Sequence, residues 1–151
     1  MQSNTSAEQT INMTTSKISP KQSTTSPMKS NLEQAKEFRK SFGVKNSKTR
    51  TSRTLQKNLI VEEFKEFLEA EGMLFRNSPH LHEDAIKELS DLVYVCYQYA
   101  ENMGWDLDEA LRRVHASNMS KLDEDGKPTY REDGKVLKSA NYQPPTLSDL
   151  V

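Results

Sequence analysis

The chain has a single cysteine, Cys96, so it cannot form an intrachain disulfide, and a buried thiol is the simplest interpretation of it. No apolar run approaches the roughly 20 residues that cross a bilayer, and the first residues lack the apolar stretch of a secretory signal. Lysine and arginine number 21 against 22 aspartate and glutamate residues, so no strong field draws the chain to nucleic acid or to an anionic membrane. We therefore expect a soluble cytoplasmic protein without membrane or direct nucleic-acid partners.

Large apolar side chains are scarce in the N-terminal segment. Residues 1–30 contain thirteen serines or threonines, interrupted by Pro20 and Pro27. Such a segment cannot bury enough surface to offset the entropy of ordering it, which predicts a disordered tail over residues 1–30. The rest of the chain is long enough for one domain with a core. We expect this helical domain over residues 31–121 and an extended C-terminal arm over residues 122–151.

Apolar periodicity and capping signals predict an all-α fold, a bundle of four to five helices. Four segments carry the pattern, and the stretches between them, 44–52 and 77–82, are expected to be connections. Two Asp-Gly-Lys turn signals in the arm are compatible with one small hairpin. The expected helices are 32–42 with Asn31 as N-cap and Gly43 as stop, 54–71 ending at Gly72, 83–103 ending at Gly104, and 107–118 capped by Asp106.

Carboxylates are concentrated on two of these helices, as Glu62, Glu63 and Glu66 on one and as Glu88 and Asp91 on the other. Residues three or four apart share a helix face, so each helix presents clustered oxygens. Two such faces turned towards each other would repel unless a cation lay between them. All-oxygen sites suit Mg²⁺ or Mn²⁺, and the pattern therefore indicates metal-assisted phosphate chemistry.

These residues and their surroundings resemble one protein family. Glu-Glu-x-x-Glu is followed after 21 residues by Glu-x-x-Asp, Phe38-Arg-Lys-Ser-Phe-Gly43 lies upstream, and His115-Ala-Ser-Asn-Met-Ser-Lys-Leu122 precedes Asp125-Gly-Lys-Pro and Asp133-Gly-Lys-Val-Leu-Lys138. Together they are similar to the MazG-like all-α nucleoside triphosphate pyrophosphohydrolases, in the branch of phosphoribosyl-ATP pyrophosphohydrolases. The resemblance runs from about Leu32 to Pro145. Ser139 stands where this branch is expected to have glycine.

The resemblance implies an enzyme that hydrolyses nucleoside or deoxynucleoside triphosphates to monophosphate and pyrophosphate, with a role in controlling the nucleotide pool. It implies Mg²⁺ as cofactor, or Mn²⁺, and a homodimer or homotetramer. It assigns metal ligands and substrate contacts. It also assigns a catalytic role to Glu62 and Glu63, in which Glu62 holds a further metal or orients the attacking water. The implied ligands are Glu63, Glu66, Glu88 and Asp91, and the implied substrate contacts are Asn118 and Lys121.

Other interpretations stay open at this stage. A solvated acidic helix face explains Glu62, Glu63 and Glu66 without any function, and a non-catalytic helical protein that binds a nucleotide or a partner is the alternative for the whole chain. A di-iron bundle would need Glu-x-x-His motifs, and no glutamate precedes a histidine by three residues. The tyrosines of the third helix are better explained as core and interface residues than as a stacking platform.

Overall fold

The computed structural model describes residues 27–151, and within this range it is helical, with no β-strand. The all-α prediction is confirmed. Of the tail predicted over residues 1–30, residues 1–26 lie outside the described range, and Ser30 caps the first helix. In chain order the elements are α1 (Asn31–Ser41), α2 (Arg50–Glu71), the short 3₁₀ helix η1 (Leu74–Arg76), α3 (Pro79–Met103), α4 (Leu107–Met119) and the 3₁₀ helix η2 (Ser148–Leu150).

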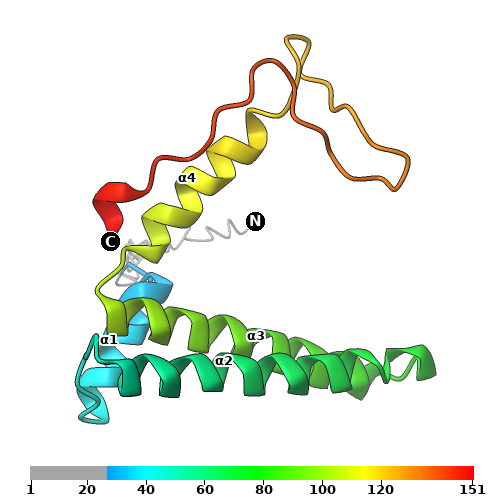
Figure 1. Cartoon of the computed structure of the whole chain (residues 1–151). Helices are drawn as coiled ribbons and strands as arrows, with labels where there is room; N and C mark the ends of the chain where they lie inside the picture. The colour runs from blue at the N-terminus through cyan, green and yellow to red at the C-terminus, as the bar shows by residue number, and fades with distance from the viewer. Residues whose placement is uncertain (1–26) are drawn as a thin grey trace, which may run out of the picture.

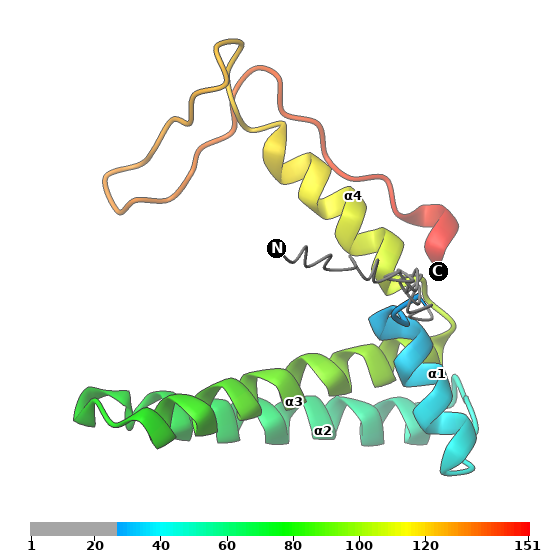
Figure 2. The same ribbon diagram turned by 180° about the vertical axis from the view of Figure 1, so that it is seen from behind.

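Two long antiparallel helices, α2 and α3, lie side by side along most of their length (Figure 1). The shorter α1 packs against α3 at one end of this pair, and α4 leaves the same end and diverges from it. Figure 2 shows the same divergence from behind, with an open angle between α4 and α3. No helix of the described part is long and apolar enough to cross a membrane.

Three helices begin earlier than the sequence pattern predicts, because a cap or a proline starts each of them upstream of the first apolar residue. The N-cap of α1 is Ser30 and not Asn31, since Ser30 Oγ accepts from the Glu33 amide and the Glu33 carboxylate accepts from the Ser30 amide. Thr49 caps α2, so the predicted connection 44–52 ends before Arg50. The start of α3 is Pro79, whose fixed φ suits the first helical turn.

The segment 77–82 is therefore a loop only over its first two residues, and His80 and His82 lie in the first turn of α3. The predicted helix ends agree more closely with the structure. Gly43 and Gly104 follow α1 and α3 with φ of 65° and 72°, a left-handed conformation that glycine adopts without a Cβ clash. Asp106 caps α4 by accepting from the Glu109 amide.

The buried apolar core is small and lies where α1, α3 and α4 meet. It comprises Leu32, Ala35 and Tyr97, with Leu107 packed against them. Helix periodicity explains this grouping, because Leu32 and Ala35 share the α1 face that contacts α3. The core fixes the α1–α3–α4 junction but leaves much of the α2–α3 pair without cover inside one chain.

Polar side chains are buried beside this core. Arg39 is 4% exposed and donates to Asn46 Oδ1 at 2.6 Å and to Asn102 Oδ1 at 2.9 Å. Asn102 is 1% exposed, and its Oδ1 also accepts from the Ser47 amide and the Ser52 hydroxyl, while its amide nitrogen donates to the Ser47 carbonyl. This network fastens the connection between α1 and α2 to the end of α3, and so sets where α2 begins.

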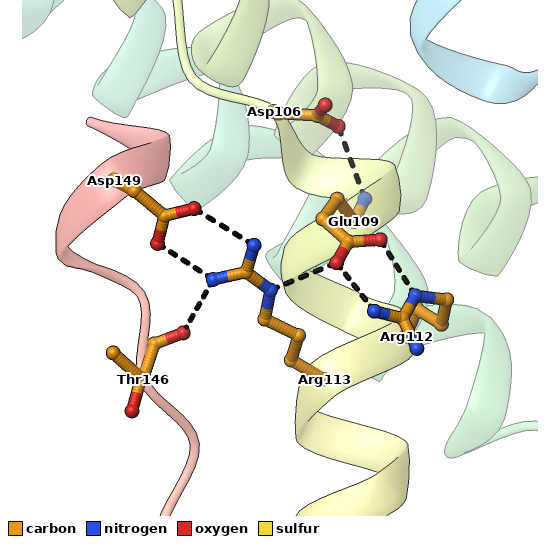
Figure 3. Close-up of polar contacts among 6 residues, drawn as sticks. All are labelled: Asp106, Glu109, Arg112, Arg113, Thr146 and Asp149. Carbon is orange, nitrogen blue, oxygen red and sulfur yellow. Dashed lines mark hydrogen bonds and ion pairs between the residues drawn. The ribbon is translucent and has the colours of Figure 1, made fainter.

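The C-terminal arm leaves α4, makes a hairpin and returns along the helix (Figure 1). The hairpin is closed by an antiparallel bridge between Tyr130 and Val136. On the return, Arg113 donates to both carboxylate oxygens of Asp149, at 2.6 and 2.8 Å, and to the Thr146 carbonyl (Figure 3). Glu109 accepts from the same guanidinium at 2.8 Å. These bonds hold η2 beside the first turns of α4.

Ser139 has a structural role that a glycine could not fill. Its hydroxyl donates to the Leu122 carbonyl at 2.8 Å and accepts from the Asn141 amide at 3.1 Å. The residue does not have a positive φ, so the backbone at this point does not require glycine. The departure from the expected pattern therefore leaves the course of the arm intact.

Candidate metal centre

The α2–α3 pair brings three of the predicted carboxylates together. Glu63 from α2 and Glu88 and Asp91 from α3 each offer one oxygen, and these oxygens all lie within 4.8 Å of one another. Each of the three residues is partly buried. Three carboxylate oxygens from two helices are a donor set that suits a hard divalent cation.

Glu88 is the most informative member of this carboxylate trio. Its side chain is only 17% exposed. Oε2 is buried without a hydrogen-bond partner, the one such side-chain atom among residues 27–151. A buried carboxylate oxygen without a partner is costly, because the charge loses its water without compensation. A cation bound by the trio would supply the missing interaction, so the residues present fit a metal ion.

Lys87 lies across the two carboxylates of α3. Its ammonium is 2.9 Å from Glu88 Oε1 and 3.0 Å from Asp91 Oδ2, and both contacts raise the pKa of the lysine. Sequence interpretation did not select this residue. The signal was present, because a lysine four residues before an aspartate lies on the same helix face as that aspartate.

Mutual repulsion is visible in the acid–base properties of Glu63. Burial raises its pKa above the ordinary 4.5, and the charges of Glu66, Asp91 and Glu88 raise it further, while Lys87 acts in the opposite direction. The trio without a metal ion is therefore a strained arrangement of like charges, and Glu66 lies close enough to contribute to it.

This repulsion predicts a pH dependence for the metal-free protein. Folding raises the pKa of the Glu63 carboxyl above 4.5, so the free energy of unfolding falls as the pH rises from 4.5 to the raised pKa. At lower pH the carboxyl is protonated in both states, and it no longer destabilises the folded protein. In EDTA, Glu63→Gln should therefore gain stability relative to wild type as the pH rises above about 4.5. Urea unfolding of both proteins at a series of pH values measures the difference. A difference that is constant with pH would contradict the prediction.

The other two glutamates of α2 have different positions. Glu62 and Glu66 are exposed and line a groove on the outer side of α2 together with Asn58, Lys65 and Glu69. Neither belongs to the converging trio. Their predicted roles in metal binding and in orienting water stay predictions.

The predicted substrate contacts lie on a different part of the chain. Lys121 donates to Asn118 Oδ1 at 2.7 Å, at the end of α4. That end of α4 is far from the α2–α3 pair in both views (Figures 1 and 2). One chain therefore does not bring these two residues to its own carboxylates.

The remaining candidates have the simpler interpretations. Tyr97 is buried in the core, and Tyr94 packs edge-on against Phe38 with ring centres 5.7 Å apart. His80 bonds to the Ser78 hydroxyl in the first turn of α3. Cys96 is partly buried, and burial raises the pKa of its thiol, as expected for a thiol that packs in an apolar helix.

Fold and site together define a class of protein. It is a helical protein in which two paired long helices bring three carboxylates together at a site that suits a divalent cation. The chain belongs to the phosphoribosyl-ATP pyrophosphohydrolase family, whose sequence model matches residues 30–118. This family is part of the MazG-like all-α nucleoside triphosphate pyrophosphatase superfamily. A comparison with curated proteins found no match. The match places the protein among the pyrophosphohydrolases, hydrolases that act on phosphoric anhydride bonds.

Proposed function

We propose that this protein hydrolyses nucleoside or deoxynucleoside triphosphates to the monophosphate and pyrophosphate, in a reaction that depends on Mg²⁺ or Mn²⁺. The observation that carries the proposal is the buried and unpartnered Glu88 Oε2 within a trio of converging carboxylates. A non-catalytic protein with a solvated acidic face would have no reason to bury this oxygen. The cytoplasm, where free nucleotides are abundant, is the compartment that we infer.

Several side chains would contribute to the reaction. Glu63, Glu88 and Asp91 would hold the cation, and Glu66 would add negative charge beside them. A bound cation neutralises charge on the polyphosphate and lowers the pKa of a coordinated water. Glu62 faces the outer groove of α2, where it would orient a water molecule or hold a further cation. The protein's own contribution is then positioning and electrostatics.

We also propose that the active form contains more than one copy of the chain. Apolar side chains on both long helices are 43% to 65% exposed: Val61, Phe64, Leu68, Ile86, Leu89 and Val93. A second copy would cover such side chains, and its α4 could bring Asn118 and Lys121 to the carboxylates that its own chain leaves distant. Light scattering measures the mass, and a fully active monomer would contradict this proposal.

A second candidate substrate is phosphoribosyl-ATP, because the matching family is described by its activity on that compound. The chemistry at the phosphates would be the same, since both substrates contain a triphosphate chain. Recognition of the base and of the added ribosyl phosphate would separate them.

The test is product analysis with a panel of ribonucleoside and deoxyribonucleoside triphosphates and phosphoribosyl-ATP. Each reaction is run with Mg²⁺ and again with EDTA, and products are separated by anion-exchange chromatography. We expect monophosphate and pyrophosphate with Mg²⁺ and neither with EDTA. Release of inorganic phosphate and a diphosphate, or equal rates in EDTA, would contradict the proposed reaction.

A further inference from the structure

We propose that Lys87 pairs with Glu88 and Asp91 while the site holds no metal, and that its ammonium moves to a phosphate of the nucleotide once a divalent cation occupies the carboxylates. The proposal rests on the proposed function and adds a substrate-binding residue to it. Lys87 would thereby be a contact to the triphosphate from the same helix that carries two of the proposed metal ligands.

The geometry of the pair contacts supports this role of Lys87. The ammonium of Lys87 is within 3.0 Å of one oxygen from each carboxylate, so it occupies ligand positions that a divalent cation would use. It reaches only Oε1 of Glu88, and the buried Oε2 stays without a partner. A lysine is thus an incomplete substitute for a cation held inside the trio.

The Lys87 side chain is also free to leave the carboxylates. The Lys87 side chain is 63% exposed, and ion pairs of such exposed lysines are weak. A bound cation would repel the ammonium and take the lone pairs that it uses. Lys87 would then be a free ammonium, on a flexible four-carbon stem, close to the place where the triphosphate must lie. Phosphate oxygens are the natural partners of such a charge.

Position on α3 supports the same assignment. The Lys87 contacts run to residues one and four positions further along the helix, so the lysine lies at the edge of the carboxylate trio and not behind it. An ammonium at this edge can turn from carboxylate to phosphate by rotation of its own side chain, without movement of the helix backbone.

The experiment compares Lys87→Met with wild type and with Lys57→Met. Lys57 is exposed on α2 outside the groove that Glu62 lines, and it forms no ion pair with any residue of 27–151. Its replacement therefore removes the same charge without removing a carboxylate contact. Calorimetry measures two dissociation constants for each protein: that of Mn²⁺ without nucleotide, and that of an α,β-methylene nucleoside triphosphate at saturating Mn²⁺.

We expect the two constants of Lys87→Met to move in opposite directions. Mn²⁺ should bind about two- to fivefold more tightly, because a competing cation is gone, and the nucleotide analogue about five- to tenfold more weakly, because a phosphate contact is gone. Lys57→Met should change each constant by less than about twofold. Equal Mn²⁺ affinity in Lys87→Met and wild type, or weaker binding of both ligands, would overturn the role of Lys87. A wild-type protein that binds no Mn²⁺ would overturn the proposed function itself.

Discussion

Glu88→Gln should lower the rate of nucleotide hydrolysis by at least about 10²-fold while leaving the metal-free protein as stable as wild type or more stable. The loss of activity follows because the substitution removes charge from the oxygen that we assign to the cation. Stability moves the other way because Glu88 Oε2 is buried without a partner and the Glu88 carboxylate lies beside those of Glu63 and Asp91. Removing the charge relieves desolvation and repulsion, and these effects exceed the lost ion pair with the exposed Lys87, since such pairs are weak.

Steady-state kinetics at saturating Mg²⁺ and urea unfolding in EDTA measure the two effects. The matched control is Glu71→Gln, which makes the same chemical change at an exposed position at the end of α2, outside the groove that Glu62 lines. It should leave both quantities near their wild-type values. An active Glu88→Gln enzyme would remove this residue from the metal site. A variant that is inactive because it is unfolded in EDTA would show that Glu88 acts through the fold.

Asn102→Ala should lower the free energy of unfolding by about 3 kcal/mol, a large change for a domain of this size. Asn102 is 1% exposed, and four hydrogen bonds meet at its side chain. Truncation would leave the buried Arg39 guanidinium without its closest partner from α3. Removing one member of a buried charged network costs more than the net value of the bond, because the remaining charge loses its compensation.

Urea unfolding in the presence of Mg²⁺ gives this value, with Asn58→Ala, at an exposed position of α2, as control. The double variant Arg39→Met with Asn102→Leu should cost less than the sum of the two single changes, since it removes both polar partners together. A loss below about 1 kcal/mol for Asn102→Ala would mean that the network contributes little to folding.

Helix positions were predictable from local chemistry, because periodicity and glycine stops depend on neighbouring residues only. Gly43, Gly104 and the Asp106 cap were all found in this way. Helix starts were predicted too late for α2 and α3, because a Thr cap before basic residues and a proline in the first turn carry no apolar signal. Such errors of a few residues do not move the carboxylates from one face to another.

The site was predictable as two acidic faces but not as a converging trio. Spacing places Glu63 and Glu66 on neighbouring parts of one face, and only the packing of α2 against α3 selects Glu63 as the residue that approaches Glu88 and Asp91. Long-range partners were equally hidden. In the sequence, Arg39 occupies an ordinary polar helix position. Its burial could not be predicted, because it depends on residues about 60 positions away.

The position of α4 shows a third limit. Leu111 of this helix is apolar yet 49% exposed, and the helix diverges from the α2–α3 pair. An apolar stripe predicts that a helix face is covered. It does not predict whether the same chain or a second copy covers that face. In the assembly that we propose, α4 of a second copy would bring Asn118 and Lys121 to the carboxylates that their own chain leaves distant.

The most direct test of the metal site is anomalous X-ray diffraction from crystals of the protein grown with Mn²⁺. We expect a peak between α2 and α3, with oxygens of Glu63, Glu88 and Asp91 about 2.0–2.4 Å from the ion. Glu88 Oε2 should be among its ligands, and Lys87 should have left both carboxylates. A structure with Mn²⁺ absent from this position, and Lys87 still paired with Glu88 and Asp91 at saturating metal, would contradict the account.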